Sequence, residues 1–283
     1  YFHENQFAYP DNPHRGDGVH PEILNLYTAL AADRVVFNSE FNRESMVEGI
    51  DRVLGMMPDE VPDGVASTVA EKSQVLPVPL EDELFEHETV PSDGPVHLVW
   101  NHRWEYDKVP ERFFGAVEQL AQSHLDFRLS VVGQQFREQP EAFDRAYEHL
   151  SDHIEQWGFV EDVDAYHDLL ARCDVVVSSS LHDFQGLAML EAVALGCLPV
   201  VPDRLAYREL FDKRFRYDSH PDDTEREAAA LARRLRELVE DPAETRSRER
   251  PSIERLRWSR LLADYRALLE DVAGLAGAAG GQC

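Results

Sequence analysis

The chain has 283 residues, of which 43% are hydrophobic, enough for one large domain or two of medium size. No apolar run approaches the roughly 18 residues of a membrane-spanning helix, so we expect no membrane contact. The formal net charge of −26 argues against binding polyanions unless a local basic patch overrides it. Because such a lysine-poor, acidic chain stays hydrated in strong salt, we interpret the charge as halophile-like. The cysteines form no motif, which favours a cytoplasmic location.

The first 80 residues combine strand and helix patterns. Tyr1–His3 resembles the end of a strand, and Val35–Phe37 and Ser73–Leu80 are further strand candidates. Apolar residues at helical spacing predict a helix over Glu40–Leu54, and Pro58–Gly64 is a predicted loop. Residues 81–94 are acidic and contain Pro, Ser and Gly, which predicts a linker between two domains.

After the linker, strand and helix patterns alternate. The strand candidates are Val96–Asn101, Phe127–Val132, Ile154–Phe159, Cys173–Ser179, Leu198–Val201 and Phe215–Tyr217. Helices are predicted over Glu111–Leu125, Asp162–Ala171 and Gly186–Leu195, and two long helices close the chain before a flexible tail. This alternation indicates an α/β fold with a parallel sheet.

One carboxylate stands out within the predicted helix Gly186–Leu195. Glu191 has apolar neighbours on both sides, and an ionised carboxylate is costly there unless it is hydrogen-bonded. The helix begins at the expected ligand edge of a parallel sheet, and its first N–H groups suit phosphate. Two vicinal hydroxyls of a sugar would satisfy Glu191. Capping of a neighbouring loop, or pairing with an arginine, is the alternative.

These residues resemble a known family. Asp183-Phe184-Gln185-Gly186, followed by Leu190-Glu191-Ala192, is similar to the E-x7-E segment of the retaining family-4 glycosyltransferases. The resemblance implies a GT-B fold, with two Rossmann-like domains. It also implies that Glu191 holds the ribose of a sugar nucleotide and that Asp183 contacts the transferred sugar, although the family usually has glutamate at the position of Asp183. Phe184, Gln185, Gly186 and Leu187 would line the donor site, the loop amides steadying the departing phosphate.

A second element resembles the R-x4-K motif of the same family, which follows the first strand of the donor domain. "WNHRWEYDK" supplies Arg103 and Lys108 at that spacing, and the resemblance implies that they grip the donor diphosphate. Cations are needed there because the leaving group gains charge as the glycosidic bond breaks. The alternative is that Arg103 and Lys108 only pair with Glu105 and Asp107.

Four sequence segments together look like those of the tRNA-queuosine mannosyltransferase group: "YFHENQ", "AADRVVFNSEFNRES", "NHRWEYDK" and "HDFQGLAMLEAV". Members of this group move mannose from GDP-mannose onto queuosine of an aspartate tRNA. The resemblance covers about residues 1–270. Family members carry a further segment before the counterpart of Tyr1, including the first strand and its glycine-rich loop. We therefore expect an incomplete N-terminal domain, a missing N-terminal segment and little activity of this chain alone.

Several other residues have two interpretations. By resemblance, His3 is catalytic and bonds the sugar or the acceptor, but a lone histidine is often structural. His102 either lines the donor pocket or packs. Ser39 and Asn42 match a family element, and Ser39 can also cap the following helix. Asp162-x-Asp164 looks like a metal motif but begins a predicted helix, where acids favour the dipole, so we expect no metal site. The arginines of residues 246–260 form either a phosphate-facing strip or a solvated helix face.

Taken together, we expect a two-domain GT-B protein. Residues 1–80 would be the acceptor-side domain and residues 95–250 the donor domain. Residues 251–283 would pack back on the first domain as a final helix with a flexible tail. The predicted reaction moves a hexose, mannose from GDP-mannose, onto tRNA with retention, without a metal or other cofactor. A transferase with another sugar nucleotide and a lipid or small-molecule acceptor is one alternative, and a non-catalytic nucleotide-binding module is the other.

Overall fold

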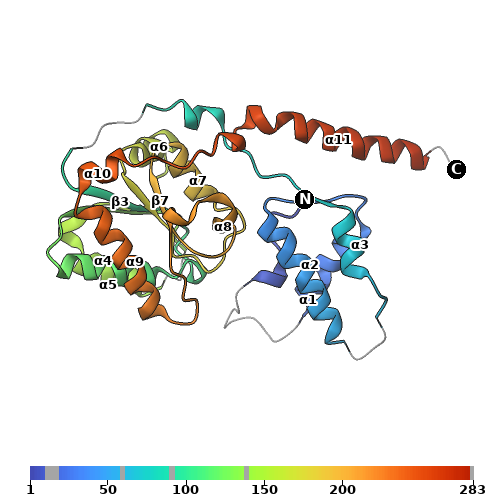
Figure 1. The fold of residues 1–283 in the computed structure, drawn as a ribbon, viewed down its shortest axis with the longest axis horizontal. Coiled ribbons are helices and arrows are strands. Elements are labelled where there is room, and N and C mark those ends of the chain that lie inside the picture. Colours follow the sequence, from blue (N-terminus) through green and yellow to red (C-terminus); the bar gives the residue numbers. More distant parts are fainter. Residues whose placement is uncertain (10–18, 58–60, 89–92, 137–139, 281–283) are drawn as a thin grey trace. The chain divides into compact units, whose positions relative to one another are not determined.

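The computed structural model describes residues 1–9, 19–57, 61–88, 93–136 and 140–280, with only the backbone described for residues 275–280. The chain forms two compact units (Figure 1). Unit 1 consists of Tyr1–Pro79 and Arg255–Cys283, and unit 2 of Leu80–Glu254. Across the parts of the chain that are described, no helix has both the length and the apolar character needed to cross a bilayer.

Unit 1 is built on two short parallel strands. β1 (Val35–Phe37) pairs with β2 (Ser73–Val75), and Phe2 forms an isolated parallel bridge with Phe37. This bridge fits the strand end predicted at Tyr1–His3. The helices are η1 (Gln6–Ala8), α1 (His20–Ala31), α2 (Glu40–Gly55), α3 (Val65–Glu71), η6 (Glu254–Leu256, at the boundary) and α11 (Trp258–Gly280).

The side chains of β1 alternate between two cores, because successive residues of a strand point to opposite faces. Val35 and Phe37 join the core formed with α1, α2 and α3, whose fully buried members include Met46, Ile50 and Val69. Val36 packs on the other face, against Leu76 and Leu261. Arg34 pairs with Asp271 at 2.9 Å on this side. Thus α11 is part of unit 1 although it is the last helix of the chain.

The predicted elements of unit 1 are confirmed for β1 and α2, and differ elsewhere. The strand predicted over Ser73–Leu80 ends at Val75, because Pro77 and Pro79 supply no ladder N–H. α1 and α3 were not predicted. Part of the predicted loop Pro58–Gly64 lies outside the described residues, and its last residue, Gly64, precedes α3 with a left-handed φ of 76°.

Unit 2 holds a six-stranded parallel sheet with the order β5-β4-β3-β6-β7-β8. The strands are β3 (Val96–Trp100), β4 (Phe127–Val132), β5 (Ile154–Gly158), β6 (Val175–Val177), β7 (Leu198–Pro202) and β8 (Arg216–Tyr217). All six predicted strands are therefore present. β3, β6 and β7 are buried along their whole length, as expected of parallel strands with both faces covered by helices.

The helices lie on both faces of this sheet (Figure 1). α4 (Pro110–Gln122) and α9 (Thr224–Val239) pack together on one face, while α6 (Val163–Ala171) and α7 (Leu187–Ala194) lie on the other. The remaining elements are η2 (Asp82–Phe85), η3 (Tyr106–Lys108), α5 (Ala142–His149), η4 (Ser151–His153), α8 (Tyr207–Leu210), η5 (Lys213–Phe215) and α10 (Pro242–Ser247). The arrangement is a Rossmann-like α/β unit.

Two segments differ from their predicted character. Within residues 81–94, which were predicted to be a linker, η2 belongs to unit 2, contacts α7 and buries Leu84. The physical reason is that Leu84 supplies an apolar anchor within an otherwise acidic segment. The tail predicted to be flexible continues α11 as far as Gly280, and its last three residues lie outside the described part of the chain.

Candidate functional site

The candidate site lies where β3 and β6 end. These strands are parallel neighbours in the sheet, so Asn101–Lys108 and Ser178–Gly186 leave it at the same edge. Hydrogen bonds join the segments directly, and the second segment donates two of them to backbone carbonyl groups of the first. Ser179 Oγ donates to the carbonyl oxygen of Lys108 at 2.7 Å, and the N–H of Leu181 donates to that of Asp107 at 2.8 Å. The sheet thus brings together the two segments that the sequence singled out.

The segment after β3 is fixed by close packing. Trp104 is buried, stacks on Phe143 with ring centroids 3.9 Å apart, and its backbone N–H donates to the carbonyl oxygen of Gln134. Gly133 has φ 147°, and a Cβ there would lie 1.9 Å from the carbonyl oxygen of His102. Only glycine fits at this crossing of the two loops.

Arg103 and Lys108 both make the ion pairs named as the alternative to phosphate binding. Arg103 Nη2 lies 3.1 Å from Glu105 Oε2, and half of its side chain is exposed. Lys108 is buried, lies 3.0 Å from Asp107 Oδ2, and donates to the carbonyl oxygen of His182. Burial raises the pKa of Asp107, but His182 and Lys108 outweigh it and hold the pKa at about 2. Diphosphate binding by Arg103 and Lys108 therefore stays a prediction.

Asp183 is held by a residue that the sequence analysis missed. The hydroxyl of Tyr207, at the start of α8, donates to Asp183 Oδ2 at 2.8 Å and lies 2.9 Å from Ser178 Oγ. Tyr207 is fully buried, and burial raises the pKa of its hydroxyl, which stays protonated as a donor. Its position in the sequence could have indicated Tyr207, because this residue follows β7, the strand next to β6, and so lies at the same edge of the sheet.

The residues after Asp183 lead into α7. Phe184 and Gln185 are buried, whereas Leu187 is exposed. Gly186 caps the helix with φ 69°, and a Cβ there would lie 3.0 Å from the ring of Tyr207. A side chain at Gly186 would thus both strain the backbone and press on the residue that holds Asp183. The N–H groups at the start of α7 face the edge where the two segments meet.

The side-chain carboxylate of Glu191 has no hydrogen bond or ion pair to any residue in the described part of the chain. It lies between buried Leu190 and Ala192 on α7, and burial raises the pKa of its carboxyl above the ordinary value of 4.5. Neither a loop cap nor an arginine partner is present among those residues. A half-buried carboxylate without a partner is energetically costly, and such costs concentrate at functional sites.

Several buried polar atoms in the segment after β3 also lack hydrogen-bond partners among the described residues. They include Asn101 Oδ1 and His102 Nε2. The amide nitrogen of Asn101 donates to the carbonyl oxygen of Ala188, in α7, and to the Tyr166 hydroxyl. Burial lowers the pKa of His102 to about 4, so its imidazole is neutral at pH 7. Asn101 and His102 are both buried, and the Nε2 atom of His102 has no hydrogen-bond partner among the described residues.

His3 belongs to unit 1 and is exposed there. Its backbone is fixed by a network of buried amides: Asn38 donates to the carbonyl oxygen of His3, and Asn42 donates to that of Phe2. Asn5 bonds Asn42 in turn. Ser39 caps α2 by accepting from the N–H of Asn42 at 3.0 Å, as one of its two interpretations predicted. A role of the His3 side chain stays a prediction.

Asp162 acts as a helix cap. Its carboxylate accepts from the N–H of Ala165 at 2.8 Å at the start of α6, which fits the interpretation of Asp162-x-Asp164 as a helix start. Within the described residues, no three metal-ligating side chains come together. Two arginines of the predicted strip at residues 246–260 bind other parts of the chain. Arg246 pairs with Asp174, and Arg250 donates to the carbonyl oxygen of Gly196.

We expect Glu191→Gln to stabilise unit 2 at pH 7. Since the pKa of Glu191 is raised by burial, the folded state holds this proton more tightly than the unfolded state, and ionising the carboxyl costs stability as pH rises. The gain of the variant over wild type should therefore shrink as pH falls from 7 to 4.5. Urea unfolding followed by tryptophan fluorescence measures it, because Trp100, Trp104 and Trp157 lie in unit 2.

Glu148→Gln is the matched control, because Glu148 is an exposed glutamate on α5 of the same unit. It removes one negative charge without removing a buried one. The prediction is contradicted if both variants change the urea midpoint equally, or if the gain of Glu191→Gln does not depend on pH. Either result would mean that the Glu191 carboxylate has a hydrogen-bond or charge partner that this structure does not show.

Two family models match the chain. Residues 1–80 match the model described as tRNA-queuosine alpha-mannosyltransferase N-terminal, and residues 82–254 match the model described as Glycosyl transferases group 1.

The chain is 34% identical over 228 residues to a tRNA-queuosine alpha-mannosyltransferase of Drosophila melanogaster, a match that covers 77% of this chain and 60% of the relative. It is 28% identical over 265 residues to a GDP-mannose-dependent alpha-(1-6)-phosphatidylinositol dimannoside mannosyltransferase of Mycobacterium tuberculosis, covering 92% of this chain and 64% of the relative. The chain thus spans less than two thirds of the length of either relative.

Solved glycosyltransferase structures share the fold. A sucrose-phosphate synthase from Thermosynechococcus elongatus has a TM-score of 0.66 at 16% identity, over 95% of this chain and 65% of that protein. A glycosyltransferase from Rickettsia africae has a TM-score of 0.64 at 16% identity, over 92% and 68%. The parallel Rossmann-like sheet matches those of GT-B glycosyltransferases. The chain belongs to the group 1 glycosyltransferases, and its N-terminal region matches the N-terminal model of the tRNA-queuosine alpha-mannosyltransferases.

Proposed function

We propose that this protein transfers mannose from GDP-mannose to queuosine in an aspartate tRNA, with retention of the anomeric configuration. The observation that carries the proposal is the half-buried, partnerless carboxylate of Glu191, next to the segments of Arg103, Lys108 and Asp183 at one edge of the sheet. In this proposal unit 2 binds the donor, unit 1 contributes to the acceptor side, and the protein works in the cytoplasm, where tRNA is modified.

The donor assignment has two supports. The Drosophila and mycobacterial relatives described above are mannosyltransferases by name, and the mycobacterial one is named as GDP-mannose-dependent. The site offers the matching chemistry, because vicinal ribose hydroxyls can donate to Glu191 and supply the hydrogen bonds that it lacks. Arg103 and Lys108 would bind the diphosphate, and the N–H groups after Asp183 would stabilise its developing charge.

The reaction breaks the bond between the anomeric carbon of mannose and the phosphate oxygen of GDP. The acceptor hydroxyl attacks from the same face, and the departing phosphate oxygen takes its proton. Asp183 would orient the sugar through its hydroxyls, held in place by Tyr207. His3 of unit 1 would bond the sugar or the acceptor. Binding of the diphosphate by positive side chains and backbone N–H groups lowers the barrier because charge grows on the leaving group.

The acceptor assignment is supported by the N-terminal match to the tRNA-queuosine family and by the Drosophila relative. The mycobacterial relative is named for a lipid acceptor, so a phosphatidylinositol mannoside is the competing acceptor.

A transfer assay separates the two acceptors. Radiolabelled GDP-mannose is incubated with this chain and either queuosine-containing tRNA, the same tRNA with guanosine in place of queuosine, or phosphatidylinositol mannoside. We expect label only in the queuosine-containing tRNA, and at a low level, because little activity is expected of this chain alone. Label in the lipid, or equal label in both tRNAs, would contradict the acceptor assignment. Calorimetry with GDP, UDP and ADP tests the donor, and a preference for UDP or ADP would contradict GDP-mannose.

We expect Arg103→Ala to weaken GDP binding about ten-fold, the loss of one charge-assisted hydrogen bond to phosphate. Binding of guanosine, which has no phosphate, should not change. Arg103 has one exposed ion pair, so the stability of unit 2 should change by less than about 1 kcal/mol. Calorimetry at low salt measures both affinities.

Arg208→Ala is the control. Arg208 is also exposed and also lies 3.1 Å from a carboxylate, that of Asp203, and it should leave GDP affinity unchanged. Equal GDP affinities of Arg103→Ala and wild type would favour the view that Arg103 only pairs with Glu105.

A further inference from the structure

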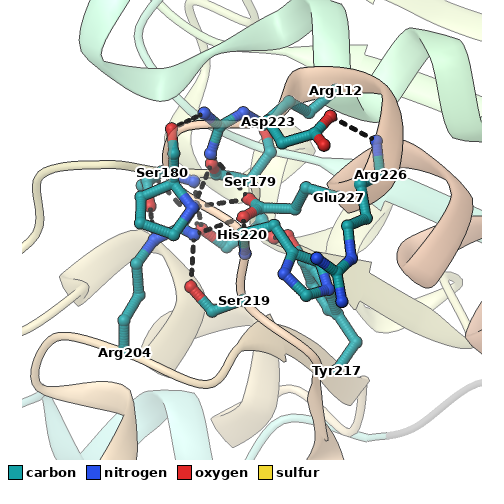
Figure 2. Close-up of polar contacts among 12 residues, drawn as sticks. Arg112, Ser179, Ser180, Arg204, Tyr217, Ser219, His220, Asp223, Arg226 and Glu227 are labelled. Atoms are coloured by element: carbon teal, nitrogen blue, oxygen red, sulfur yellow. Dashed lines mark hydrogen bonds and ion pairs between the residues drawn. The ribbon is translucent and has the colours of Figure 1, made fainter.

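A buried ionic cluster contacts Ser179 and Ser180, which precede the Asp183 loop of the candidate site (Figure 2). Its centre is Glu227 of α9, which is completely buried. Arg204, which follows β7, binds both carboxylate oxygens of Glu227 at 2.7 Å, and Arg112 of α4 binds one of them at 2.8 Å. The N–H of His220 also donates to Glu227. Although burial alone would raise the pKa of Glu227, Arg204, His220 and Arg112 lower it below the ordinary value.

Arg204 does more than neutralise Glu227. Its Nε donates to the carbonyl oxygen of Ser180 at 2.9 Å, and Nη2 donates to that of Ser179 at 3.0 Å. Nη1 also donates to Ser219 Oγ at 2.7 Å. With its two bonds to Glu227, Arg204 thus uses a hydrogen bond for each N–H of the guanidinium group. A lysine, with three donors on a single nitrogen, cannot reproduce this planar arrangement.

The segment that Arg204 holds is the start of the loop leading to Asp183. β6 ends at Val177, so the carbonyl groups of Ser178–Ser180 need partners beyond the sheet. Tyr217 supplies one, because its hydroxyl donates to the carbonyl oxygen of Ser178 at 3.0 Å. Arg204 supplies the other two. Leu205, the residue after Arg204, has φ 57°, an unfavourable value for leucine that its surroundings must maintain.

The cluster also reaches the other half of the site. Arg112 lies in the first turn of α4, which begins two residues after Lys108. Glu227 therefore connects the element that follows Lys108, through Arg112, with the segment that precedes Asp183, through Arg204. A buried ion cluster is weak evidence for stability alone, because desolvation offsets much of the attraction. The buried carbonyl groups of Ser179 and Ser180 need hydrogen-bond donors, which a packed apolar group of the same volume would not supply.

We propose that Arg204 and Glu227 are positioning residues for donor binding: they hold the Ser179–Ser180 backbone, and through it the Asp183–Gly186 loop, in register with the segment of Arg103 and Lys108. The proposal rests on the proposed function in so far as that loop binds the sugar nucleotide. No contact of Arg204 or Glu227 with the nucleotide itself is implied.

The experiment compares Arg204→Lys with Arg246→Lys. Arg246 is a matched arginine at the opposite end of the strands: it pairs with Asp174 and donates to the carbonyl oxygens of Gly94 and Pro95. Both variants should lower the melting temperature of the full chain. Only Arg204→Lys should speed hydrogen exchange of the amides of residues 181–187 and weaken GDP binding, by about ten-fold or more, since small displacements at a site are costly.

Calorimetry with GDP and hydrogen exchange are both measured well below the melting temperature of each variant. Should Arg204→Lys fail to fold, Tyr217→Phe removes one bond from the same segment and should show the same two effects more weakly. Its control, Tyr265→Phe, removes a hydroxyl that donates to the carbonyl oxygen of Pro77 in unit 1.

The proposal is overturned if hydrogen exchange and GDP affinity change equally in the Arg204 and Arg246 variants. Such a result would mean that Arg204 contributes only to stability. The two hypotheses fail in different ways. If wild type does not bind GDP, the proposed function is wrong, and the positioning role in donor binding falls with it, whatever hydrogen exchange shows. If wild type binds GDP and Arg204→Lys binds it equally well, the positioning role alone is wrong.

Discussion

The parallel pairing of β3 with β6 is the constraint on which the rest of unit 2 depends. These strands are adjacent in the sheet although some 70 residues separate them along the chain. Because they run in the same direction, the segments that follow them leave at one edge. Ser179 and Leu181 after β6 donate to carbonyl groups of the segment after β3, and Lys108 donates in return to the carbonyl oxygen of His182. Without this pairing Arg103, Lys108, Asp183 and Glu191 would be unrelated residues.

The site combines groups that are well satisfied with two that are not. Asp107 and Glu227 each have a cationic partner, and Asp183 accepts a hydrogen bond from the neutral Tyr207 hydroxyl. Glu191 has none among the described residues, and neither does the second ring nitrogen of His102. We interpret this contrast as a preorganised site, in which the ligand completes the hydrogen bonds that the protein leaves open.

Much of this fold was predictable from the sequence, and the reasons are local. β4 and α6 have apolar patterns that indicate both their type and their bounds. α1 and α3 were not predicted, because the apolar residues of α1 are largely exposed and α3 is only seven residues long. Leu84 shows the same limit: a single apolar residue in an acidic segment carries no periodic signal, yet it decides where that segment packs.

The candidate site was predictable only in part. Glu191 stood out because its neighbours are apolar, whereas the partners of Arg103 and Lys108 are their own sequence neighbours and left two interpretations open. Tyr207, Arg204 and Glu227 carry no local signal. Tyr207 lies 24 residues from Asp183 along the chain, and Glu227 lies 115 residues from Arg112. Contacts of this kind come from the order of strands in the sheet, which the pattern of one sequence does not reveal.

The central claim is that ribose hydroxyls satisfy Glu191, and a binding cycle tests it most directly. GDP and 2′,3′-dideoxy-GDP are titrated into wild type and Glu191→Ala by calorimetry. The account predicts that wild type binds GDP about ten-fold or more tightly than the dideoxy compound, the cost of losing hydrogen bonds to a charged acceptor, and that Glu191→Ala binds the two alike. If wild type shows no preference, or if Glu191→Ala retains it, the hydroxyls bind elsewhere and the account is contradicted.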